Sequence, residues 1–177
     1  MEYNKPNTLA SLLNKDEVRY VTQEITPEEV QYVADVKCVY DECAEKGCTE
    51  EQSEDILYVT KIIAFADKFR VLHWAAVNMS FHKTIDDFYS EIEDYKDAIA
   101  ENIQGVVGQF RGCEFTDIKL PLSDNPLEII NELKICVQNW MKLHEDDIEY
   151  EGCRNATSTF LETIYKYVYL FRLCKQD

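Results

Sequence analysis

The chain has 177 residues, of which 46% are hydrophobic and 29% charged, with five glycines and four prolines. Such a length allows one domain with a sizeable core, and such a composition is typical of a helical globular protein. Because no apolar run reaches 18 residues and the N-terminus lacks the apolar segment of a secretory signal, we expect no membrane span and a cytoplasmic location.

The formal net charge is −16, and the lysines and arginines form no cluster. A protein that binds duplex DNA needs clustered cations to neutralise phosphates, so we expect no DNA binding. The seven cysteines are odd in number and include no CxxC pair. Their pattern favours a reducing compartment in which the thiols pack as small apolar side chains.

Two segments are expected before the main domain. Residues 1–25 show no periodicity and are interpreted as an arm. Thr26 and Pro27 then provide a helix N-cap and a first-turn proline, and the apolar spacing that follows predicts an accessory helix ending at Gly47. We therefore expect an N-terminal arm and accessory helix over 1–48 and a helical bundle over 49–177.

Four amphipathic helices are predicted in the bundle. The first begins after Thr49 and ends near Asn78, and the second begins at Phe81. The apolar residues of the second recur at steps of four and three, at positions 81, 85, 88, 92, 95 and 99. A third helix begins at Asn125-Pro126, and a fourth follows an acidic break at 145–149. We expect His144, at the end of the third helix, to serve as a C-terminal cap.

Residues 104–124 form a long connection between the second and third helices of the bundle. A connection of this length is expected to cross the bundle instead of closing a tight hairpin. The sequence therefore predicts an all-α fold, a ferritin-like four-helix bundle with a long crossover and an extra N-terminal helix.

The second helix carries a stripe formed by His82, Asp86, Asp97 and Glu101. At 3.6 residues per turn these side chains fall within about 100° of one face, roughly 150° from the apolar positions, so they are expected to point out of the bundle. Imidazole and carboxylate are the ligands that iron and other borderline divalent metals take. Carboxylates alone would be weak evidence in so acidic a chain, but two of its three histidines occur in this pattern or next to it.

Asp86 and Asp97 lie eleven residues apart, roughly 16 Å along a helix, so one ion cannot bind both within one chain. A second copy of the helix, antiparallel about a two-fold axis near residues 91 and 92, would place His82 opposite Glu101 and Asp86 opposite Asp97. Such an isologous dimer would create two equivalent sites. His73, near the end of the preceding helix, is expected to supply a second nitrogen.

The segment from His73-Trp74 through His82, Asp86, Asp97 and Glu101 resembles the motif of the Dps family of mini-ferritins. The resemblance implies that His73, His82 and Asp86 of one subunit and Asp97 and Glu101 of its mate hold two irons between subunits. It also implies a ferroxidase that uses peroxide or O2 to oxidise Fe(II), in a shell of about twelve subunits. Other divalent metals also suit these ligands.

The resemblance is specific over about residues 54–104 and has two departures. The short turn before His82 resembles that of compact Dps-like proteins of large phages, for which host cytoplasm or virion is the implied location, and residues 1–50 are an extension. The alternative is a non-catalytic structural or interaction protein that kept the fold. We expect Trp74 to be a packing residue.

Overall fold

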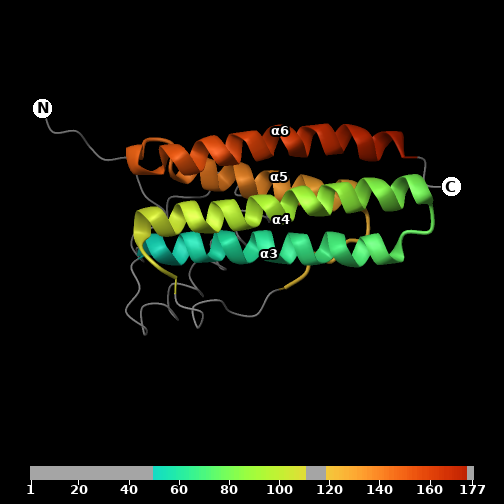
Figure 1. Ribbon diagram of the computed structural model, residues 1–177, viewed down its shortest axis with the longest axis horizontal. Helices are drawn as coiled ribbons and strands as arrows, with labels where there is room; N and C mark the ends of the chain where they lie inside the picture. Colours follow the sequence, from blue (N-terminus) through green and yellow to red (C-terminus); the bar gives the residue numbers. More distant parts are fainter. Residues whose placement is uncertain (1–49, 111–118, 175–177) are drawn as a thin grey trace, which may run out of the picture. The chain divides into compact units, whose positions relative to one another are not determined.

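The computed structural model describes residues 50–110 and 119–174, which form four α-helices and one short 3-10 helix (Figure 1). The helices are α3 (Glu50–Ala75), α4 (Met79–Val107), α5 (Pro126–Leu143), η2 (Ile148–Tyr150) and α6 (Glu151–Leu173). Within these ranges there is no strand, which confirms the all-α prediction for this part of the chain. The predicted arm and accessory helix at 1–48 lie outside the described residues.

The chain divides into two compact units, Met1–Leu57 and Tyr58–Asp177, with the division inside α3. The predicted boundary between residues 48 and 49 lies outside the described part and stays a prediction. The second unit contains most of α3 and all of the other described helices, and the following account concerns it.

Local chemistry explains where the helices begin and end. The side chain of Asn78 accepts hydrogen bonds from the first turn of α4, and Asn125 does the same for α5, which has Pro126 in its first turn. Helix α4 continues through Gly105 and ends at Val107, because Gly108 adopts φ 92°, a conformation that favours glycine. Helix α4 thus begins two residues before the predicted Phe81, and α3 ends three residues before the predicted Asn78.

All four helices contribute apolar side chains to one core. Its fully buried members include Phe69 of α3, Phe88 of α4, Leu133 of α5 and Ile164 of α6. The predicted packing of four helices against each other is therefore confirmed. None of the described helices has a stretch both long and apolar enough to cross a bilayer.

The directions of the helices follow from contacts at their two ends. Tyr58 of α3 stacks on Trp140 late in α5, whereas Lys68, further along α3, pairs with Asp124 just before α5. Helix α5 is therefore antiparallel to α3, and Figure 1 shows it running in the same direction as α4. The connection from 108 to 125 thus joins opposite ends of the helical unit, as a long crossover does.

Candidate metal centre

Helix α4 separates apolar and acidic residues on opposite faces, as its spacing predicts. Its buried side chains are Ile85, Phe88, Ile92, Tyr95, Ile99 and Ile103. Asp86, Asp97 and Glu101 are all exposed, and His82 is half-buried. The predicted stripe therefore lies on the outer face of the helix.

The turn between α3 and α4 brings two histidines into contact. His73 lies in the last turn of α3, and His82 lies in the first turn of α4 because Asn78 caps that helix. Their rings are 4.0 Å apart between centroids, and the two Nε2 atoms are 2.8 Å apart. Residues nine positions apart in sequence thus present converging ring nitrogens.

The other ring nitrogen of each histidine faces an oxygen. His82 Nδ1 donates to the backbone carbonyl of His73 over 3.0 Å, and His73 Nδ1 lies 3.3 Å from Oδ1 of Asp86. An acceptor at Nδ1 favours the tautomer that carries its proton there and leaves a lone pair on Nε2. Two such lone pairs repel each other at 2.8 Å unless a proton or a metal cation lies between them.

Asp86 is 56% exposed and contacts the His73 ring on the side away from the paired Nε2 atoms. Its carboxylate holds the orientation of that ring, which is a common role of carboxylates beside metal-binding histidines. Among residues 50–110 and 119–174, no group of three or more His, Cys, Asp or Glu side chains could hold a metal ion by itself. The described part of one chain supplies two nitrogens and a nearby carboxylate, without a complete coordination sphere.

Asp97 and Glu101 lie further along α4 and do not approach the histidine pair. Neither makes an ion pair or a side-chain hydrogen bond with the residues that the structure describes. The structure therefore brings three of the five predicted site residues together, and leaves these two as a separate acidic group on the same face. Between the groups, Glu93 is paired with Lys96 over 2.9 Å.

Two neighbouring residues escaped the sequence interpretation. The guanidinium of Arg70 lies over the ring of Tyr89, 5.8 Å from its centroid, and also pairs with Asp67. The position of Arg70 three residues before His73 was the available signal, since residues at this spacing share a helix face. Their contact joins α3 and α4 on the face that carries the stripe.

The remaining predicted positions near the site behave differently. Trp74 is 71% exposed, so the expectation that it packs is wrong for the described chain, in which it lies outside the core. His144 forms the C-cap of α5, as expected, and its buried ring stacks on Tyr150 with centroids 3.8 Å apart. It belongs to the turn between α5 and α6, away from the other two histidines.

These features define a helical bundle with a histidine pair and an acidic stripe on one outer face. The chain belongs to a family of unknown function, DUF5856, which matches residues 73–171. The match begins at His73 and includes all five predicted site residues. No curated protein and no solved structure matches the chain.

Proposed function

We propose that this protein is a Dps-like member of the ferritin-like superfamily, which oxidises Fe(II) at a site shared between two copies. Its role would be iron storage or removal of peroxide. The observation that carries the proposal is the 2.8 Å approach of the His73 and His82 Nε2 atoms, with an oxygen at each Nδ1. Two nitrogens at this separation can bind one cation, because metal–nitrogen bonds are about 2.0–2.1 Å long.

The second copy would complete the coordination. The histidine pair and Asp86 supply ligands at one end of α4, and Asp97 and Glu101, which have no ion pair among the described residues, supply carboxylates near the other. An antiparallel pair of α4 helices brings the unlike ends together twice, which gives two sites that each hold two irons. Imidazole and carboxylate donors suit Fe(II), and the absence of a thiolate among them suits a site that must survive peroxide.

The proposed reaction transfers two electrons to peroxide and consumes two protons. Two Fe(II) ions each give one electron to hydrogen peroxide, the O–O bond breaks, and two protons complete two water molecules. The chain's own contribution is to hold the ions next to each other and to keep the His73 and His82 rings in the tautomer that binds metal. The carboxylates offset the charge of the Fe(III) products.

The helix arrangement supports the same proposal. The parallel directions of α4 and α5, joined by a connection between opposite ends of the unit, fit a ferritin-like bundle with one long crossover. In such bundles metal usually lies inside the core, whereas this core is lined by apolar and aromatic side chains. An outer, shared site is consistent with both facts.

Oxidation of added Fe(II) under controlled oxygen, followed by absorbance near 300 nm with and without peroxide, tests the proposal. The parent should oxidise Fe(II) well above the protein-free rate. In His82→Ala the rate above the protein-free rate should be at least tenfold lower than in the parent. Glu162→Gln, which alters an exposed acid of α6, is the matched control and should keep it. A parent that oxidises no faster than buffer would favour the alternative, a non-catalytic structural or interaction protein.

A further inference from the structure

The outer face of α4 carries negative charge that would oppose the approach of a second copy. Asp86, Asp97 and Glu101 are exposed on it, and the last two have no cationic partner among the described residues. The whole chain has a net charge of −16, so two copies repel each other at long range as well. Lys83, beside His82, is also exposed on this side of α4, but the exposed carboxylates outnumber it, so added positive charge would favour contact between two such faces.

Some of the charges near the centre of the same face are compensated. Lys96 compensates Glu93, and Arg70 lies over Tyr89 and pairs with Asp67. Uncompensated carboxylates among the described residues therefore occur at both ends of the stripe and, at Asp94, near its middle. The face as a whole keeps an excess of negative charge, which bound cations would reduce.

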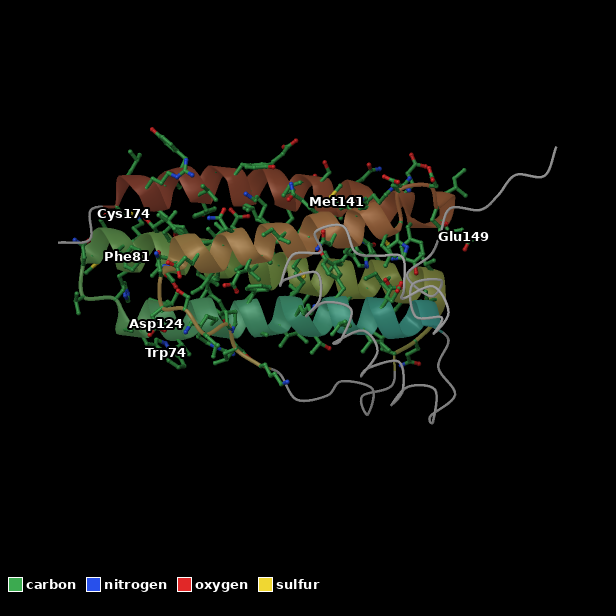
Figure 2. The ribbon with its side chains drawn as sticks, turned by 180° about the vertical axis from the view of Figure 1, so that it is seen from behind. Trp74, Phe81, Asp124, Met141, Glu149 and Cys174 are labelled. Carbon is green, nitrogen blue, oxygen red and sulfur yellow. The ribbon has the colours of Figure 1, made fainter. Side chains whose placement is uncertain are left out.

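An exposed tryptophan flanks the histidine pair. Trp74 is 71% exposed and its neighbour Val71 is 40% exposed, whereas the other tryptophan, Trp140, is 1% exposed. Figure 2 shows Trp74 on the outer side of α3, at the end of the unit that also carries Phe81. Large aromatic side chains exposed beside polar ones are typical of contact surfaces with another protein.

Gly105 provides an independent reason for a close approach. It lies inside α4, one turn beyond Glu101, where glycine costs about 0.5–1 kcal/mol relative to alanine. A Cβ built at Gly105 would meet nothing within 4 Å, and the φ of Gly105 is not in the left-handed region. Neither packing nor backbone conformation in the described chain therefore requires glycine at this position. In a pairing that sets 82 opposite 101, residue 105 lies opposite 78, where the α3–α4 turn of a second copy would need the space.

We propose that divalent cations switch this face between two states: monomeric when free of metal, and paired with a second copy when the sites are filled. The inference rests on the proposed shared site and adds its regulation. Cations that bind the pair more tightly than the single chain shift the equilibrium towards the pair. In the paired state Trp74 is buried, and the α3–α4 turn of the second copy packs against Gly105.

Sedimentation velocity on the full chain, with EDTA or with Mn²⁺ under argon, measures the switch without any oxidation. We expect a monomer in EDTA and at least a tenfold lower dissociation constant for the pair in Mn²⁺. Tryptophan emission should shift to shorter wavelength over the same Mn²⁺ titration and become less accessible to acrylamide. Trp74→Phe, which leaves buried Trp140 as the reporter, should abolish that shift.

Two sets of variants test separately whether charge repulsion and close packing control the pairing. Asp97→Asn with Glu101→Gln should pair at least tenfold more tightly than the parent in EDTA and lose the response to Mn²⁺, whereas Asp146→Asn with Glu162→Gln should behave as the parent. Gly105→Leu should leave the monomer folded, by circular dichroism, and weaken pairing in Mn²⁺ at least tenfold.

Pairing in EDTA as tight as in Mn²⁺ would overturn the switch and leave the proposed ferroxidase intact. A neutralised variant as monomeric in EDTA as the parent would show that charge does not keep the copies apart, which also overturns it. Pairing driven by Mn²⁺ in a protein that oxidises no Fe(II) would support the switch and contradict the ferroxidase. Tight Mn²⁺ binding by a strict monomer would contradict both.

Discussion

At the scale of single residues, the core contains a chain of buried hydroxyl groups that links three helices. Tyr58 of α3 bonds Tyr95 of α4, and Tyr95 bonds Thr157 of α6 over 2.9 Å. Thr157 also donates to the backbone carbonyl of Cys153 over 2.8 Å. Because water cannot replace a lost partner there, the chain fixes how these helices align.

Removal of the central hydroxyl tests this. Tyr95→Phe removes the hydroxyl that bonds both Tyr58 and Thr157 and should lower the free energy of unfolding by about 1–3 kcal/mol. Tyr165→Phe, which removes an exposed hydroxyl that accepts a bond from Gln138, is the control and should change it by less than about 0.5 kcal/mol. Urea unfolding compares the two, and equal effects would contradict the role of the buried chain.

The same burial predicts a dependence on alkaline pH. Burial raises the pKa of Tyr58 and Tyr95 above their usual range, that of Tyr167 to about 12, and that of the Cys136 thiol to about 11. In the unfolded chain these groups ionise near pH 9 to 10. Their contribution to stability is therefore complete below about pH 9 and is lost as the pH rises through the folded values.

We expect the free energy of unfolding by urea to stay level from about pH 7 to 8.5 and to fall steadily between about pH 9.5 and 11.5. Tyr95→Phe removes one of the groups responsible and should make the fall less steep. A stability that does not change up to about pH 11 would show that these phenols are not shielded as their burial indicates.

The sequence predicted the stripe because helical spacing fixes direction: Asp86, Asp97 and Glu101 are exposed where Ile85 and Ile99 are buried. It could not predict that Asp86 would contact the outer edge of the His73 ring. That contact depends on the crossing of α3 and α4 and on ring rotation, which no periodicity encodes. The exposure of Trp74 depends on the same geometry.

At the scale of elements, the turn between α5 and α6 is held by one side chain. The guanidinium of Arg154 donates to the backbone carbonyls of His144, Glu145 and Asp147. The carbonyls at a helix C-terminus lack partners within the helix, and one nitrogen of Arg154, Nη1, lies within hydrogen-bond distance of all three. The polar break predicted at 145–149 thus becomes an ordered turn.

Arg154→Ala should lower the free energy of unfolding by about 1.5–3 kcal/mol, since it removes charge-assisted bonds from a partly buried turn. Arg154→Lys should recover part of this, because its ammonium keeps the positive charge and several N–H donors. Arg172→Ala, an exposed arginine in the last turn of α6, is the control and should have little effect. An alanine variant at 154 as stable as the parent would contradict the account of the turn.

Helix boundaries were predicted well where side chains cap the backbone and less well elsewhere. Asn125 and Pro126 begin α5 as expected, because their chemistry is local. The connection was predicted to begin at residue 104, yet α4 passes through Gly105 and ends before Gly108. Glycine permits a helix to end but does not require it, and here the burial of Ile103 on the core face holds the intervening turn in place.

At the scale of the molecule, the crossover was predicted from the length of the connection, and the directions of α4 and α5 agree with it. How two copies pair cannot be predicted from the length of a connection within one chain. Two-fold symmetry about residues 91 and 92 was inferred because only that placement sets a histidine end of the stripe against an acidic end.

A mixture of two inactive variants tests the shared site most directly. His82→Ala and Glu101→Ala should each lose most Fe(II) oxidation alone, because each removes a ligand from both sites of the pair. When they are refolded together, each mixed pair has one site without either residue and one intact site, so about half of the parent activity per mixed pair should return. Mixed pairs that demonstrably form yet stay as inactive as either variant would contradict a site shared between two chains.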